Sequence, residues 1–440
     1  MRLRVAGDIL VAPHGRRAAD LVAEDGTGTR LGEPGRAGPA DEEIDAFGRL
    51  VLPGFIDPYV HRQGPGTPEE EGLVHATLAA VWGGVTTIFD ILNTVPPLDV
   101  AHPVVARGTM YQGQAWADFG LRGHALDRER RELVYETAGR SPESLLPLHD
   151  TAEVQDLLRE VAAADGLLAV HGEERGALDS VARRLEGPVR DEADLLAAHP
   201  DTAEAATIAL LAETASGTGR RPHVVYLSSA RGLRAVRQAQ AAGITVPGEA
   251  CRRYLTLTEA DDPCPGSRLE VFPLVRTAAD REASWAGTAD GTITSVGCDH
   301  ASHLREQEER SPAEAPAGAI GVETLPPVPL GAMTAGRISR ERRCRVLAEG
   351  TARPCRVYPW KGALRPGSDG DLTIVDPEAE WRTDEGRLHS SHRLSPRHGR
   401  CGRGCPRLTA LRGEVVGREG KPVVEPRGRP LEPRPGGRTG

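Results

Sequence analysis

Five short segments place polar side chains directly after apolar, strand-like runs of the chain. His61 lies in VLPGFIDPYVHRQGPG (51–66), His171 in LLAVHGEE (167–174), and Asp299 and His303 in CDHASH (298–303). The other two segments are GGVTTIFDILNTVPP (83–97) and HVVYLSS (223–229). Histidine and aspartate can transfer protons in catalysis, and both bind Zn²⁺. One histidine after a strand is more often structural, but five such segments in this order indicate a single site assembled from several strand ends.

The segments between these motifs predict the elements that must position them. Apolar residues recur at i, i+3, i+4 and i+7 from Val154 to Val161, which is the pattern of an amphipathic helix. Alternating β-then-α patterning over about 300 residues favours a (β/α)₈ barrel, with a doubly wound sheet as the runner-up. In a barrel, the carboxyl ends of the strands carry the chemistry. The expected strands are 167–170, 223–227 and 244–246, and the expected helices are 203–215 and 231–241.

The composition of the chain indicates which partners it can bind and in which cellular compartment it is expected. The chain has 440 residues with 54 basic and 63 acidic side chains, so its net charge of −9 disfavours binding to nucleic acid or anionic lipid. No apolar run reaches the roughly 18 residues of a membrane-spanning helix, and the first residues do not resemble a secretory signal. Seven scattered cysteines are typical of reduced thiols. We therefore expect a cytoplasmic protein that contacts neither membrane nor nucleic acid.

The order of the five segments resembles the cyclic-amidohydrolase branch of the amidohydrolase superfamily, which includes dihydroorotases, allantoinases, hydantoinases and dihydropyrimidinases. DILNTVPP (90–97) most resembles dihydroorotase, and GALRPGSDGDLTIVDPEAEW (362–381) resembles the family's C-terminal strands. The resemblance implies a TIM-like (β/α)₈ barrel over residues 54–352 and a small β-sandwich domain from both chain ends, residues 1–53 and 353–425. Residues 426–440 are expected to form a disordered tail. A homo-oligomer is also expected.

The same resemblance implies two divalent metals, held by a His-x-His pair, a carboxylated lysine, two further histidines and an aspartate. His61, His171 and Asp299 match three of these ligands. Tyr59 and Tyr226 stand at two histidine positions, and Tyr135, beside Glu136, stands near the lysine position. Because no lysine occurs in residues 1–360, no carboxylated lysine can form in the barrel. We therefore predict no cofactor, with a single divalent metal at His61, His171 and Asp299 as the weaker alternative.

The substrate-binding positions implied by the resemblance have also changed. Gln63 stands where dihydroorotase has an arginine for the substrate carboxylate, whereas Asn93 and His303 match two kept contacts. Arg252 or Arg253 could supply a compensating cation. The tyrosines either fill space left by lost ligands or orient a substrate. The predicted substrate-binding set is Tyr59, Gln63, Asn93, Tyr135, Tyr226 and His303.

Two functional hypotheses follow. In the first, the chain is an enzyme with a rebuilt site that opens, closes or rearranges a small cyclic amide, imide or ureide at a C–N bond without the two-metal centre. Asp299 would be the general acid/base, and His61 and His171 would carry protons or stabilise an oxyanion. In the second, the chain is a non-catalytic, dihydroorotase-like scaffold for a partner such as aspartate carbamoyltransferase.

Overall fold

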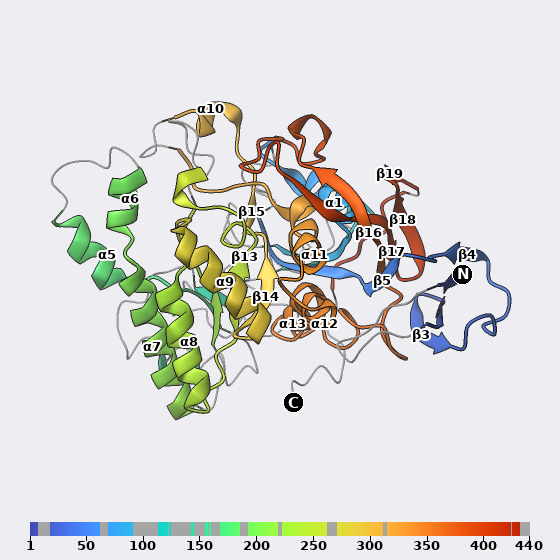
Figure 1. The fold of residues 1–440 in the computed structure, drawn as a ribbon, viewed down its shortest axis with the longest axis horizontal. Helices are drawn as coiled ribbons and strands as arrows, with labels where there is room; N and C mark the ends of the chain where they lie inside the picture. The colour runs from blue at the N-terminus through green and yellow to red at the C-terminus, as the bar shows by residue number, and fades with distance from the viewer. Residues whose placement is uncertain are drawn as a thin grey trace.

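The computed structural model shows a parallel barrel flanked by helices on one side and by β-sheets from both chain ends on the other (Figure 1). No helix in the described part of the chain is long and apolar enough to cross a membrane. The structure describes residues 1–7, 18–61, 69–90, 113–121, 123–124, 142–144, 155–156, 158–159, 168–184, 192–218, 222–261, 271–310, 315–423 and 425–431.

The parallel strands form two sheets that together make the barrel wall. Every residue of β6 and β7 is buried, as expected for parallel strands that are covered on both faces. The wall closes because β15 follows β14 after two residues and pairs in parallel with β6. One sheet contains β15 (His300–Ala301), β6 (Phe55–His61), β7 (Val85–Asp90) and β8 (Asp118–Leu121). The other contains β9 (Gly123–His124), β10 (Pro142–Ser144), β11 (Ala169–His171), β12 (His223–Val225), β13 (Gly248–Cys251) and β14 (Ile293–Gly297).

This closed barrel confirms the predicted fold class and excludes the open doubly wound sheet. The helices expected at 203–215 and 231–241 are α7 (Asp201–Thr218) and α8 (Ala230–Ala241), which lie beside α9 (Ala278–Asp290) in Figure 1. The prediction of a strand at 244–246 is wrong, because the chain joins the sheet only at Gly248, where β13 begins. The segment Gly248–Cys251 forms the strand because it can pair with β12 on one side and β14 on the other. Residues 244–246 have a higher strand propensity but do not make these pairs. The remaining helices include α1 (Gly72–Gly83), α5 (Arg175–Ala182), α6 (Glu192–Ala198), α10 (Arg305–Glu308), α11 (Pro327–Thr334), α12 (Arg340–Cys344) and α13 (Gly350–Ala352).

Both ends of the chain build the β-sheets beside the barrel, as predicted. The pairing of β5 with β16 joins strands more than 300 residues apart in the sequence and places Pro53 opposite Leu372. One sheet has the order β3 (Thr27–Gly32), β2 (Asp20–Glu24), β1 (Arg2–Ala6) and β4 (Glu42–Asp45). The second has the order β19 (Lys421–Pro422), β18 (Glu414–Arg418), β17 (Cys401–Leu411), β16 (Leu372–Arg382) and β5 (Leu50–Pro53).

The start of the expected disordered tail is instead held against the barrel. Gly428 N donates to Ala115 O at 2.7 Å, and Leu431 N donates to Phe119 O at 2.8 Å. Pro430 forms a parallel bridge with Phe119 of β8. Residues 426–431 therefore extend the barrel edge, and only residues 432–440 of the expected tail lie outside the described part of the chain.

Candidate functional site

The carboxyl ends of the barrel strands bring several of the predicted polar residues to one end of the barrel. His61 ends β6 and His171 ends β11. Tyr226 follows β12 directly, while Arg253 and Asp299 each lie two residues beyond β13 and β14. Parallel strands place all these positions at the same rim of the barrel, which is where (β/α)₈ enzymes build their sites.

Asp299 lies between two groups that can carry positive charge. Its Oδ1 is 3.3 Å from Nε2 of His61, and its Oδ2 accepts a hydrogen bond from Nη2 of Arg253 at 2.5 Å. The same nitrogen of Arg253 also donates to the backbone carbonyls of Cys298 and Asp299. Burial raises the pKa of Asp299, but the charge of Arg253 and the contact with His61 outweigh burial and lower that pKa to about 2. Asp299 is therefore an ionised carboxylate that is held by a buried guanidinium.

Two of the residues at this rim adopt a backbone conformation that side chains other than glycine rarely take. The φ angles are +61° at Tyr226 and +50° at Asp299. Such conformations cost roughly 1–3 kcal/mol and persist only where the surrounding fold enforces them. Tyr226 also packs edge-on against Tyr59 with ring centroids 5.0 Å apart, and its ring lies 6.0 Å from that of His171. Both tyrosines are buried, so they shape the interior of the rim rather than its surface.

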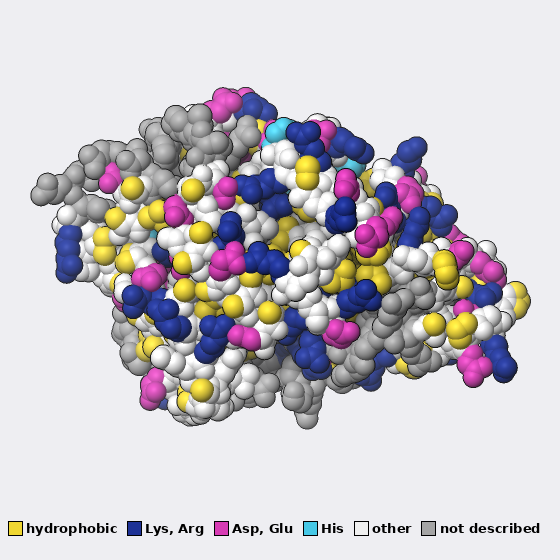
Figure 2. Space-filling model, in the orientation of Figure 1, with side chains coloured by type: hydrophobic (Ala, Val, Ile, Leu, Met, Phe, Trp, Pro, Cys, Tyr) yellow, Lys and Arg dark blue, Asp and Glu magenta, His cyan; other side chains and the backbone are white. Residues whose placement is uncertain are grey.

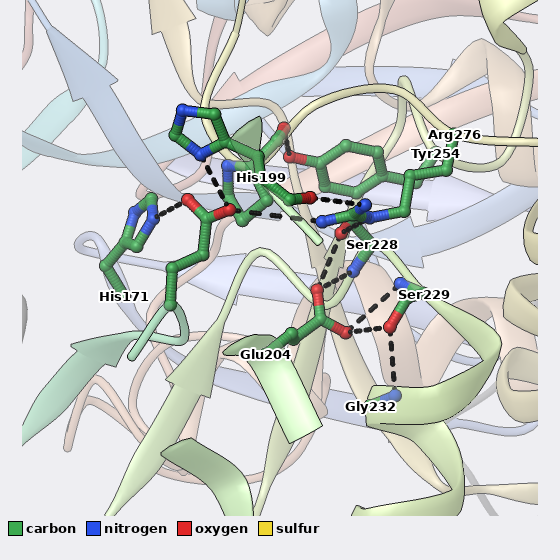
Figure 3. Close-up of polar contacts among 10 residues, drawn as sticks. His171, His199, Glu204, Ser228, Ser229, Gly232, Tyr254 and Arg276 are labelled. Atoms are coloured by element: carbon green, nitrogen blue, oxygen red, sulfur yellow. Dashed lines mark hydrogen bonds and ion pairs between the residues drawn. The ribbon is translucent and has the colours of Figure 1, made fainter. Parts of the chain in front are cut away.

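His171 belongs to a second polar group, in which it and His199 both contact the carboxylate of Glu173. Figure 3 shows the two histidines at this group. Nε2 of His171 lies 2.8 Å from Oε2 of Glu173, and Nδ1 of His199 lies 3.0 Å from Oε1. Burial raises the pKa of Glu173, but hydrogen bonds from the two histidines outweigh burial and hold that pKa well below its usual range. No hydrogen bond or ion pair joins His171 to Asp299 among the described residues. The predicted set is therefore divided, with His171 oriented by Glu173.

Arg276 connects this group to a buried network, since its Nη2 lies 3.9 Å from Oε1 of Glu173. Figure 3 shows the network of Arg276, Ser228, Ser229 and Glu204. Arg276 donates from Nε to Ser228 Oγ at 2.9 Å and from Nη1 to His199 O at 2.9 Å. Glu204 accepts hydrogen bonds from the backbone nitrogen and hydroxyl of both Ser228 and Ser229, at 2.6 to 3.1 Å. These contacts fix the segment that follows β12, which carries Tyr226. Sequence reasoning missed Glu173 and His199, although Glu173 follows His171 by two residues in LLAVHGEE.

The two histidines after Asp299 have different surroundings. Nδ1 of His303 lies 3.4 Å from Oε2 of Glu70, and its Nε2 contacts Ala317 O at 3.2 Å. Burial is the main cause that lowers the pKa of His303. His300 is fully buried and accepts a hydrogen bond at Nδ1 from Gly321 N, which is a structural contact. Gln63, Asn93, Tyr135 and Glu136, which the sequence also singled out, lie outside the described residues.

The described rim residues do not fit the two-metal ligand set that the family pattern implies. His61 and Asp299 face each other, which suits one shared cation, but the second oxygen of Asp299 is taken by Arg253. His171 is instead hydrogen-bonded to Glu173. Tyr226 is a poor ligand, because a phenol is neutral at pH 7.

Known proteins similar over nearly the whole chain are cyclic amidohydrolases. The chain is 31% identical over 439 residues to an allantoinase of Streptomyces avermitilis, covering 97% of both chains. It is 29% identical to an L-hydantoinase of Paenarthrobacter aurescens, covering 94% of both, and 29% identical to a dihydroorotase of Pelotomaculum thermopropionicum, covering 94% of this chain and 98% of that one. The solved structure of the L-hydantoinase (dihydropyrimidinase) from Arthrobacter aurescens superimposes with a TM-score of 0.92 at 27% identity, covering 98% and 99%. No protein-family model matches the chain.

The chain therefore belongs to the cyclic-amidohydrolase branch of the amidohydrolase superfamily. The resemblance predicted from the five motifs is confirmed. The relatives have the names of enzymes, and nothing among them supports the non-catalytic scaffold.

The prediction of no cofactor is wrong as it stands. The chain belongs to a branch whose pattern implies metals, and the described residues include three buried carboxylates that could hold a metal ion. They belong to Asp118, Asp369 and Asp371, with one oxygen of each within 4.8 Å of the others. This group, which we call the aspartate cluster, lies at the amino end of β8, opposite the rim, and Nζ of Lys361 lies 2.6 to 3.0 Å from all three residues. Sequence reasoning missed the cluster because Asp118 is about 250 residues from the other two.

Proposed function

We propose that the chain opens or closes the ring of a small cyclic amide, imide or ureide at the rim of its barrel. Membership of the cyclic-amidohydrolase branch supports the substrate class. The observation that carries the proposal is the buried carboxylate of Asp299, which lies between His61 and Arg253 at the strand ends. We infer that this arrangement is a rebuilt version of the family site.

In the proposed hydrolysis, a water oxygen adds to the ring carbonyl carbon and the carbon–nitrogen bond breaks. The proton that the water loses moves to the ring nitrogen, and Asp299 carries it. An aspartate with a pKa of about 2 is a weak base, so the contact with Arg253 must loosen first. A substrate carbonyl oxygen that draws the guanidinium of Arg253 toward itself would do this and would also stabilise the developing oxyanion.

The other rim residues have supporting roles in this proposal. His61 contacts Asp299 on the side away from Arg253. The hydrogen bond with Glu173 holds the ring of His171 in one orientation at the rim. The buried tyrosines would exclude water and orient the substrate ring. We propose that the substrate is bound by Tyr59, Gln63, Asn93, Tyr135, Tyr226 and His303.

The test is a panel of hydantoin, dihydropyrimidine, allantoin and dihydroorotate substrates, with ring opening and ring closure followed by absorbance. We expect turnover of at least one ring, and we expect Asp299→Asn to lower kcat by roughly 10²–10⁴-fold. The change also leaves the buried guanidinium of Arg253 without its counter-ion, so we expect a lower melting temperature and compare kcat at a temperature where both proteins are folded. Asp290→Asn is the matched control, since Asp290 lies at the end of α9 and pairs with Arg237. Full activity in Asp299→Asn would refute the mechanism, and a folded protein that turns over no ring would refute the function.

A further inference from the structure

A large cavity on the outside of the barrel is lined by an excess of positive charge. It has a volume of about 1090 Å³ and lies between α9, α11 and the strands β16 and β17. Figure 2 views this face and shows Lys and Arg side chains gathered between the positions of α9 and α11. Among the described residues of the lining, Glu380 is the one acidic residue, whereas six are arginines. These are Arg281, Arg337, Arg382, Arg397, Arg400 and Arg403.

Four of the six arginines already have carboxylate partners. Arg281 and Arg337 pair with Glu282, and Arg400 pairs with Asp261. Arg403 pairs with Glu378 and Glu380. In contrast, no ion pair is found for Arg382 or Arg397 among the residues that the structure describes.

Arg397 is the most unusual of these side chains, because it is buried without a counter-ion. Only 3% of its surface is exposed, and its Nε and Nη1 are buried with no hydrogen-bond partner in the described part of the chain. The guanidinium lies over the ring of Trp381, 5.4 Å from the centroid, which stabilises the charge but satisfies neither nitrogen. Burial, followed by the charges of Arg252 and Arg400, lowers the pKa of Arg397 to about 9. A buried cation in such surroundings is costly unless an anion neutralises it.

We propose that this cavity binds a small metabolite that carries two or more phosphate groups, with Arg397 and Arg382 as its principal contacts. A guanidinium presents paired donors that match phosphate oxygens, and the two unpaired arginines supply two such groups in one cavity. The volume is sufficient for a ligand larger than phosphate itself. This site is separate from the rim, although Leu255 and Thr256 in its wall belong to the same turn as Arg253.

The test is isothermal titration of pyrophosphate into the full chain at low ionic strength. We expect saturable binding at one site, and we expect Arg397→Gln and Arg382→Gln each to raise the Kd by about tenfold or more, because each removes a charge-assisted contact. Arg36→Gln is the matched control, since it removes one exposed arginine from the distant N-terminal segment and should change the Kd less than about twofold.

Two results would overturn the proposal. One is the absence of saturable heat with the wild-type chain, and the other is an equal loss of affinity in Arg36→Gln and Arg382→Gln, which would indicate non-specific attraction to positive charge. Arg382 is exposed, so we expect Arg382→Gln to fold. Its Kd therefore tests the proposal even if Arg397→Gln does not fold. Because the readout is binding, it does not depend on turnover at the rim.

Discussion

Lys361→Met should destabilise the fold strongly, because it removes the centre of the aspartate cluster. Nζ of Lys361 lies 2.6 Å from Asp118, 3.0 Å from Asp369 and 2.6 Å from Asp371, and all four side chains are almost fully buried. Burial lowers the pKa of Lys361, but the three carboxylates outweigh burial and raise it above its usual range. Without Lys361, Arg412 is the remaining cation in contact with Asp118 among the residues that the structure describes. Removing one partner from a buried ion pair costs about 3–5 kcal/mol, and we expect a loss of this size in the free energy of unfolding.

Urea denaturation followed by circular dichroism measures this loss. Lys421→Met is the matched control, because Lys421 is the other lysine of the chain and is exposed in β19, so its replacement should change the free energy of unfolding by less than about 0.5 kcal/mol. Added Ca²⁺ or Mg²⁺ should restore part of the stability of Lys361→Met, since the three carboxylates would then be free to bind a cation. The reasoning fails if Lys361→Met loses less than about 1 kcal/mol, or if the cations stabilise the wild-type chain equally.

Two further predictions concern buried carboxyl groups. Burial raises the pKa of Asp57 from 3.8 to about 7, so its ionisation opposes folding, and the stability that it contributes falls as pH rises through this window. As pH rises from 4 to 8, the free energy of unfolding of Asp57→Asn should therefore increase relative to that of wild type, by up to the order of 4 kcal/mol. A constant difference between the urea midpoints of the two proteins across this pH range would contradict the raised pKa. Glu204→Gln should lower stability by about 2 kcal/mol or more, since the amide nitrogen cannot accept hydrogen bonds from Ser228 or Ser229; an unchanged urea midpoint would show that the network adds nothing.

The sequence predicted the barrel well because its signals are local and repeated. Helices α7 and α8 lie where the alternation of strand-like and helix-like segments placed them, and the two chain ends pair as the motifs implied. The strand at 244–246 failed because pairing with two neighbouring strands, rather than local composition, decides which residues join the sheet. Contacts between distant segments, such as the aspartate cluster, leave no local pattern to detect.

Prediction of the rim from sequence was less complete. His61 and Asp299 were expected to lie together, and they do. Arg253 was foreseen only as a possible cation for a substrate, and its contact with Asp299 depends on how two loops fold over each other. Glu173 was missed because carboxylates after strands are common. Its special feature is that His171 and His199 share its carboxylate, and the sequence does not reveal that His199 lies beside it.

In the proposed mechanism, the contact between Arg253 and Asp299 would link substrate binding to proton transfer. While the guanidinium holds the carboxylate, the pKa of Asp299 stays near 2 and the group cannot take a proton from water at neutral pH. A substrate oxygen that competes for the guanidinium weakens that hold, so the basicity of Asp299 should rise only when a ring occupies the rim. In this arrangement one arginine would both stabilise negative charge on the substrate and release the base that acts on it. The positive φ angle of Asp299 fits such a role, because strained backbone is maintained where a side chain must be held in one place.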